Sequence, residues 1–556
     1  MNNITKFSTL ALAAAMAFTG CIKETQPTTV VTSDAVAQSS TAVEAMVNAI
    51  PVAEALPYSV YGSGQNRGFD FGLPGIMCAT DAATGDVVGT SGDANSGYNW
   101  FWFFEVGTRL NSNAYVSSFT WYCYWNFIKS CNDIISIVVD PQTDDMKAFL
   151  AYAKANRAAL YLDLARSFDP LENNYTDVSK VKGLTVPLIT ETTTEAEARN
   201  NPRLPRQEMF DFIFSDLDEA EALLTGNSHS AGKDVPSLAV VYGLKARAYL
   251  WLGGFEEGLY AEIPTGEAAY KKAAEYARKA ITASGATPLT KDQYIDKTNG
   301  FNTVNQAWLW AMIQSQDTVL SNLHSFTAQI APEGSWGYGG IICPGVRKCV
   351  YDRMSDTDFR KLVIVGPTTT YADFAQYTNI PSAAYWAQWG AFGYGVYPYT
   401  SFKFRPAGGE MSNSSTGNAT SIPLMRVEEM MLIEAEATAH YDAVNGKALL
   451  EAFMAYRDPS YTYAATDLVE EIIFQKRVEL WGEGLIVFDL KRLDYGIDNA
   501  YDGANALNGW RFKTDHRVPL WNLCIPLTEV QQNVALDGKN NPDPSDALES
   551  HDVAGE

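Results

Sequence analysis

The feature that most constrains the fold is a series of helix-length stretches in which apolar residues recur every three or four positions. One stretch, 144–168, is followed by Pro170, and it carries Met146, Phe149, Leu150, Ala153, Leu160 and Leu164. A second begins after Pro205, and its apolar stripe consists of Phe210, Ile213, Leu217, Ala220 and Leu224. This spacing, with proline at the ends, predicts amphipathic helices. The chain is therefore predicted to be mainly α.

Further helices are expected over 43–55, 119–139, 237–252, 267–284, 425–441, 447–456 and 468–481. In 267–284, Ala273, Ala277 and Ala280 have the small-residue spacing at which the helices of tetratricopeptide (TPR) repeats cross closely. The spacing between helix pairs is irregular. We therefore expect TPR-like helical hairpins with insertions, over about 118–284 and 425–493.

Two long regions, about 58–104 and 286–422, lack this periodicity and are rich in Gly, Asn and aromatic residues. Long ordered loops often carry function. In the first region an aromatic run follows Tyr98, and it is either a buried strand or a platform on which sugars stack. In the second, 336–340 and 385–389 place Trp and Tyr beside Gly and Gln. Both regions are candidate binding loops.

The N-terminus has the pattern of an export signal. Lys6 precedes a short apolar run at 10–18, and Thr19 and Gly20 lead directly to Cys21. The run is shorter than the roughly 20 residues that a membrane-spanning helix needs. The pattern resembles a bacterial lipobox, which implies a signal peptide over 1–20 and acylation of Cys21. An ordinary signal peptide is the alternative. Residues 21–42 are predicted to be a flexible linker.

Composition narrows the classes of function. The formal net charge is −24, which disfavours binding to nucleic acid. The seven Cys and five His show no zinc-site spacing. Cys343 and Cys349 could close a small disulfide loop, but we favour small apolar roles for all the cysteines except Cys21. No cofactor is predicted, and a Ca²⁺ ion near the acidic loops has no ligand pattern to support it.

Several short segments resemble, in order and spacing, motifs of the SusD/RagB family of outer-membrane lipoproteins. They are Arg157-Ala158-Ala159-Leu160-Tyr161, Val186-Pro187-Leu188, Ala246-Arg247-Ala248-Tyr249-Leu250, the 426–437 helix, Glu479-Leu480-Trp481-Gly482-Glu483-Gly484, Asp489-Leu490-Lys491-Arg492 and Ile525-Pro526-Leu527. Gln475 and Ile486 depart from the family pattern, which usually has charged residues there. Two charges of a presumed buried network are thus absent together.

The resemblance implies a SusD-like α-α superhelix forming one domain over 43–540, with a loop-rich irregular part and a polar tail at 541–556 that we expect to fray. It also implies a lipid-anchored protein of the outer membrane that faces the cell exterior. Family members cover a SusC-like TonB-dependent transporter and capture a nutrient, usually a glycan. They are not enzymes.

The leading functional hypothesis is capture of an oligosaccharide, because sugars need aromatic faces together with a few polar groups. Candidate ligand-binding residues are Asn66, Arg67, Asp81, Tyr98, Trp100, Trp336, Tyr338, Trp386 and Trp389. The alternatives are a peptide-capturing, RagB-like protein and a TPR-type scaffold without its own ligand. A glycoside hydrolase would need a pair of carboxylates, which the sequence does not single out, and no metal site is predicted.

Overall fold

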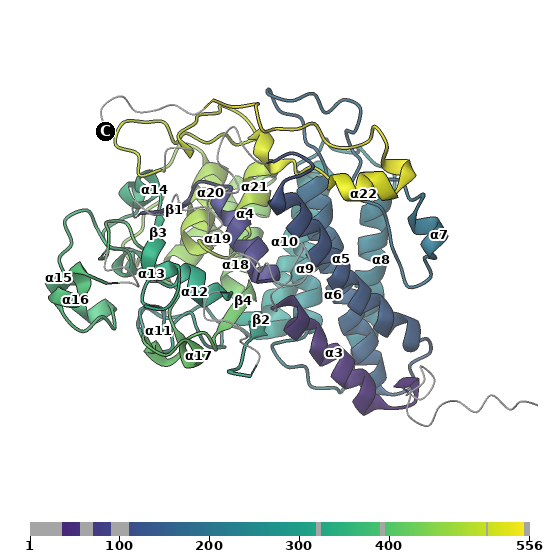
Figure 1. The fold of residues 1–556 in the computed structure, drawn as a ribbon, viewed down its shortest axis with the longest axis horizontal. Coiled ribbons are helices and arrows are strands. Elements are labelled where there is room, and N and C mark those ends of the chain that lie inside the picture. The colour runs from purple at the N-terminus through teal and green to yellow at the C-terminus, as the bar shows by residue number, and fades with distance from the viewer. Residues whose placement is uncertain are drawn as a thin grey trace, which may run out of the picture.

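The computed structural model describes residues 36–55, 71–90, 110–317, 324–389, 395–506 and 510–549. Long helices fill one side of the molecule, and short helices, short strands and loops fill the other (Figure 1). The mainly α, TPR-like fold is confirmed. Cys21 and the predicted signal peptide and linker up to residue 35 lie outside the described residues.

The helices expected from periodicity lie close to their predicted positions, and the shorter α21 follows them. They are α3 (Ser40–Glu54), α5 (Tyr115–Ile137), α6 (Asp144–Phe168), α8 (Arg206–Leu224), α9 (Leu238–Gly253), α10 (Gly266–Ser284), α18 (Val427–Ala439), α19 (Ala443–Met454), α20 (Leu468–Glu479) and α21 (Ile486–Arg492). Local chemistry fixes their ends. At the start of α6, for example, the Thr143 side chain accepts a hydrogen bond from the backbone N–H of Met146.

The remaining elements are short. The helices are α4 (Leu73–Ala82), α7 (Glu195–Ala198), α11 (Lys291–Tyr294), α12 (Phe326–Ile330), α13 (Gly339–Ile342), α14 (Lys348–Arg353), α15 (Tyr371–Phe374), α16 (Ala383–Ala387), α17 (Ser414–Gly417) and α22 (Leu527–Gln532). The 3₁₀ helices are η3 (Phe359–Val363), η4 (Ala375–Tyr377), η5 (Ala407–Gly409), η7 (Pro519–Trp521) and η8 (Val534–Leu536). Strands β1 (Val87–Gly89) and β3 (Pro344–Val346) pair antiparallel, as do β2 (Trp308–Ile313) and β4 (Ser421–Arg426).

The helices pack in sequential pairs, and small residues let them approach. Ala273, Ala277 and Ala280 of α10 are fully buried, as the small-residue spacing predicted, and α10 packs against α9 and α18. Helices α18 and α19 cross at Gly446, where a Cβ atom would lie 2.6 Å from the Cα atom of Ala439. These contacts confirm the close crossings of a TPR-like superhelix.

A buried network of charged side chains joins the helical side to the loop-rich side. The Glu479 carboxylate, which is fully buried, accepts hydrogen bonds from Arg426, Arg457 and Arg360 at 2.8–3.2 Å. Burial alone would raise the pKa of Glu479, but Arg457, Arg426 and Arg360 hold it well below its usual range. Gln475, the departure noted above, accepts a hydrogen bond from Arg360 at 2.5 Å and donates one to Glu471 at 2.9 Å.

The polar tail is packed over much of its length. The Asn541 side chain donates hydrogen bonds to the backbone oxygens of Phe168 and Leu523, both at 2.8 Å, and Leu548 is buried. The expectation of fraying is therefore wrong for 541–549, because backbone groups elsewhere in the chain bind these side chains. Cys343 is buried and Cys349 exposed, and the two form no disulfide.

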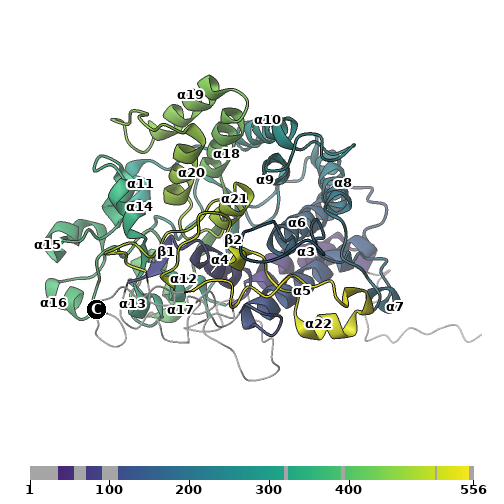
Figure 2. The ribbon, with the colours of Figure 1, turned by 90° about the horizontal axis from the view of Figure 1, so that it is seen from above.

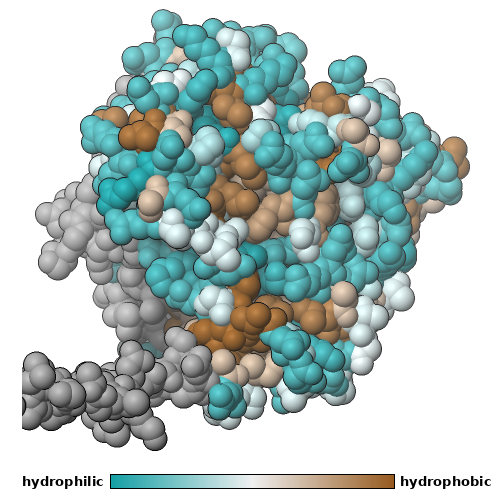
Figure 3. Space-filling view, turned by 90° about the vertical axis from the view of Figure 1, so that its right-hand side faces the viewer, coloured by the Kyte–Doolittle hydropathy of each residue, from teal (hydrophilic) through white to brown (hydrophobic). Residues whose placement is uncertain are grey.

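The face over α7 and α8 is mostly hydrophilic, with hydrophobic residues gathered near its middle and lower part (Figure 3). Within the described ranges, every helix is too short or too polar to traverse a lipid bilayer.

Candidate functional site

An extension of the loop-rich side, residues 371–389, presents aromatic side chains at the edge of the molecule. We refer to it as the aromatic arm. It contains α15, η4 and α16, and it lies at the left in Figures 1 and 2. The Ser382 side chain caps α16 by accepting a hydrogen bond from the N–H of Tyr385. This cap starts a single helical turn that carries Tyr385 and Trp386.

The two neighbouring aromatic residues of α16 have different environments. Trp386 is half-buried and packs parallel to Phe402, with ring centroids 6.0 Å apart, and against Phe374 at 5.5 Å. Tyr385 is 58% exposed, and its ring makes a T-shaped contact with that of Trp389, with centroids 6.3 Å apart. A large aromatic ring left in water on an ordered turn is available to stack on a ligand.

A buried ion pair fixes the arm to the rest of the protein. The Glu333 carboxylate accepts hydrogen bonds from the Thr378 hydroxyl at 2.7 Å and the Asn379 N–H at 2.6 Å. It also pairs with Arg405 at 3.0 Å, and Arg405 donates a hydrogen bond to the backbone oxygen of Tyr377 at 2.7 Å. Glu333 and Arg405 are at most 1% exposed. Buried charge-assisted hydrogen bonds are strong, so the arm has a defined position.

Trp389 makes the second attachment, because its indole N–H donates to the backbone oxygen of Pro332 at 2.9 Å. Trp336 stands on the same loop, and its N–H donates to Asn418 at 3.2 Å. Its ring lies so close to Gly417 that a Cβ atom there would approach it to 2.2 Å. Trp336 is therefore held at a fixed position on a loop that is bonded directly to the aromatic arm.

The structure thus joins some of the predicted site residues and separates others. Trp336, Trp386 and Trp389 belong to the arm and its supporting loop, with Trp389 buried, and the half-buried Tyr338 precedes α13 on that loop. Asp81 of α4 is inside the protein, where it accepts a hydrogen bond from the N–H of Gly484 at 2.9 Å. Asn66, Arg67, Tyr98 and Trp100 lie outside the described residues.

Sequence reasoning missed Tyr385, Glu333 and Arg405. The stretch 385–389 was a candidate from its composition, but the exposure of Tyr385 follows from Trp386 packing against Phe402 and Phe374, which no local pattern gives. The partnership of Glu333 with Arg405 spans 72 positions and has no local signature.

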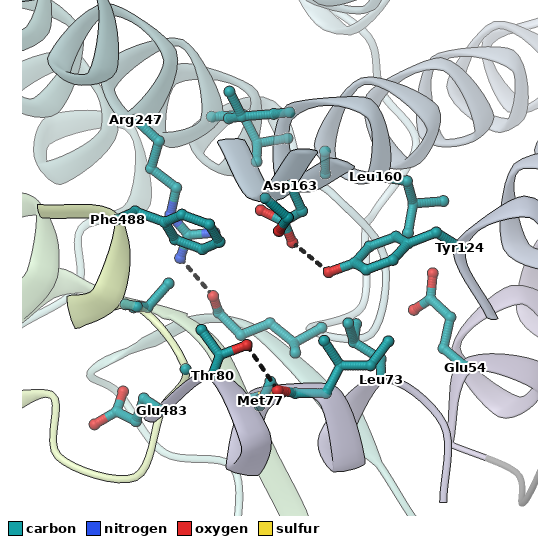
Figure 4. Close-up of a pocket in the computed structure, with 18 of the residues that line it drawn as sticks. Glu54, Leu73, Met77, Thr80, Tyr124, Leu160, Asp163, Arg247, Glu483 and Phe488 are labelled. Atoms are coloured by element: carbon teal, nitrogen blue, oxygen red, sulfur yellow. Dashed lines mark hydrogen bonds between the residues drawn. The ribbon is translucent and has the colours of Figure 1, made fainter. Parts of the chain in front are cut away.

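A small internal cavity lies between the helices near the middle of the molecule. Its walls include Glu54 of α3, Thr80 of α4, Tyr124 of α5 and Asp163 of α6 (Figure 4). The Tyr124 hydroxyl donates to Asp163 at 3.1 Å. Burial, and to a lesser degree the charge of Asp163, raises the pKa of Glu54 to about 8.

This cavity does not fit a glycan. Its volume is about 60 Å³, enough for a few water molecules. Ligand pockets usually measure about 300–1,000 Å³. The carboxylates around it therefore have no access to a glycosidic bond. In the described parts of the chain, no three His, Cys, Asp or Glu side chains gather to hold a metal ion. The expectations of no cofactor and no enzymatic activity stay predictions.

Together the fold and the arm define a class: a helical-hairpin protein that carries aromatic residues on ordered loops. Two family models match the sequence. The one described as "SusD family" matches residues 364–542, and the one described as "Starch-binding associating with outer membrane" matches residues 77–250. These segments include most of the helical hairpins, though not α10, and they include the aromatic arm.

Solved structures agree with the family models. A SusD-like carbohydrate-binding protein from Bacteroides vulgatus superposes with a TM-score of 0.65 at 20% identity, over 91% of this chain and 98% of that one. Surface glycan-binding protein A from Bacteroides thetaiotaomicron gives 0.61 at 17% identity, over 90% and 98%. No sequence among the curated proteins matches. The chain belongs to the SusD/RagB family, whose proteins bind carbohydrate and associate with the outer membrane.

Proposed function

We propose that the protein captures an oligosaccharide at the cell surface and that the aromatic arm forms part of its binding site. The observation that carries this proposal is the exposed ring of Tyr385, on a turn fixed by the Glu333–Arg405 pair. A fixed aromatic ring offers a flat apolar surface without the entropy cost of ordering a mobile loop. The apolar faces of sugar rings are complementary to such a surface.

Polar groups beside the ring supply the other half of a sugar site. Gln388 is exposed directly after α16, and Ser382 is partly exposed at its start. Amide and hydroxyl groups bind sugar hydroxyls and orient the ring. The negative charge of the chain favours a neutral glycan over an acidic one.

The cellular setting of the proposal rests on the sequence. Cys21 is proposed to be acylated and to anchor the protein in the outer membrane, facing the exterior. Two or more acyl chains give stable anchoring. The captured glycan is proposed to pass to a SusC-like TonB-dependent transporter, as the family resemblance implies. The 21–42 segment would then be the link between the anchor and the folded domain.

A glycan and peptide array with the full-length chain, solubilised in detergent, tests the proposal. We expect binding to one class of oligosaccharide and a loss of at least tenfold in affinity for Tyr385→Ala. Tyr456→Ala is the matched control, because Tyr456 is 50% exposed but lies outside the arm. Glycan binding that Tyr385→Ala leaves unchanged would place the site elsewhere. Binding to peptides alone would favour the peptide-capturing alternative.

A further inference from the structure

A second, larger cleft opens between α14, α20 and the loop at 458–462. We refer to it as the polar cleft. Its volume is about 350 Å³, within the range of small-molecule sites and well above that of the internal cavity. The aromatic arm contributes no residue to its lining. A site here would therefore be separate from the one proposed above.

Two buried carboxylates, Asp458 and Glu471, line the polar cleft and differ in how many hydrogen bonds they already accept. An ionised carboxylate can accept about four. Asp458 accepts two from Ser460, through its N–H and hydroxyl, one from Thr357, and a further one from the Ser355 hydroxyl. Although burial raises the pKa of Asp458, these bonds lower it overall, so the group is ionised at neutral pH. Asp458 is 2% exposed.

Glu471 is the second buried carboxylate of the cleft and is 8% exposed. It accepts hydrogen bonds from Tyr461 at 3.2 Å, Gln475 at 2.9 Å and Arg353 at 2.7 Å. The third carboxylate of the cleft, Asp358, already accepts four hydrogen bonds from Arg360. Glu471 thus offers about one more acceptor position to a ligand that brings hydroxyl donors, whereas the positions on Asp458 are occupied.

The apolar part of the cleft is small. Phe474 and Met454 form it, and the guanidinium of Arg353 covers the Phe474 ring at 4.2 Å. Its volume of about 350 Å³ stands at the low end of the range of small-molecule sites. The cleft is therefore of a size for one sugar ring and too small for a long chain.

We propose that the polar cleft is a second carbohydrate site, which takes a single neutral sugar ring. A neutral hydroxyl can donate to Glu471, whereas an acidic sugar would bring a like charge beside both Asp458 and Glu471. Arg353 does not offset this charge, because Glu470 and Glu471 already bind it, at 2.9 and 2.7 Å. The site does not depend on the aromatic arm.

Calorimetric titration of the full-length chain with glucose, galactose, N-acetylglucosamine, glucuronate and CaCl₂ tests this site. We expect at least one neutral sugar to bind and glucuronate to bind at least tenfold more weakly. Thr462→Trp, which fills the cleft from its exposed rim, should weaken sugar binding at least tenfold. Thr466→Trp is the matched control: the same loop, the same substitution and an exposed position that does not line the cleft.

Three results would overturn the proposal: no neutral sugar binds, Thr462→Trp binds as tightly as the wild type, or only Ca²⁺ binds. Circular dichroism of both variants shows whether the fold is retained. The proposal for the aromatic arm is tested independently of this one, because Tyr385→Ala should leave monosaccharide binding at the polar cleft unchanged. Loss of oligosaccharide capture in Tyr385→Ala, with cleft binding intact, would support both sites.

Discussion

The buried Glu54 carboxyl gives the protein a pH-dependent stability that can be measured. No described residue donates a hydrogen bond to it, and it is 2% exposed. Because its pKa is raised from 4.5 to about 8, the folded protein keeps this proton where the unfolded chain has lost it. The stabilising contribution is therefore complete below about pH 4.5 and is lost as the pH rises through 8. Each pKa unit corresponds to about 1.4 kcal/mol, so the full interval corresponds to roughly 5 kcal/mol.

Glu54→Gln replaces the titratable carboxyl group by an amide that does not titrate, and it keeps the shape of the side chain. Between pH 5 and 7.5 the wild type should lose about 3 kcal/mol of unfolding free energy that the variant keeps. Urea denaturation followed by tryptophan fluorescence measures the difference. Glu479 does not interfere, because its lowered pKa confines its effect to more acidic solutions.

The control for this experiment is Glu44→Gln, on an exposed position of the same helix, α3. It should leave the wild-type slope unchanged, since an exposed carboxylate is solvated in both the folded and the unfolded state. Asp81, whose pKa burial also raises to about 8, contributes equally to all three proteins and cancels in the comparison. A Glu54→Gln slope equal to that of the wild type would refute the reasoning.

Three further changes have expected outcomes. Glu479→Gln should cost about 3–5 kcal/mol in urea denaturation, because it leaves buried arginines without their partner, whereas the exposed Glu470→Gln on the same helix should cost little. Gly446→Ala should lower the free energy of unfolding by about 1–3 kcal/mol, since the new Cβ meets the backbone of Ala439. Cys21→Ala should abolish incorporation of labelled fatty acid and shift the protein out of the outer-membrane fraction.

Local patterns predicted the helices well because each helix carries its own evidence. The 144–168 stretch has an apolar stripe, an N-terminal threonine and a following proline, and it is α6 in the structure. Features that depend on distant partners were not predicted. The packed tail depends on Asn541 reaching Phe168, which is 373 positions away. Likewise, the exposure of Tyr385 depends on contacts that hold the whole arm.

The absent charge at Gln475 has a physical explanation. Its amide oxygen accepts a hydrogen bond from Arg360, and its amide nitrogen donates one to Glu471. A glutamate at this position could not donate, and it would place a second negative charge beside Glu471. The loss of the charge is thus compensated within the network. Gln475 also lines the polar cleft, so the departure from the family pattern falls at the proposed second site.

The residues of the family-like motifs stabilise the fold, whereas the residue proposed to bind ligand lies at the surface. Arg426, Glu479 and Glu483 stand in family-like motifs and are buried in the charged network, where each partner depends on the others. Tyr385 lies on a surface turn outside this network, and its ring contact is with Trp389 of the arm. Changes in the network should therefore alter stability and leave sugar preference unchanged, whereas changes at Tyr385 should do the reverse. This separation lets one fold carry different binding loops, and it explains why the motifs identify the family without specifying the glycan.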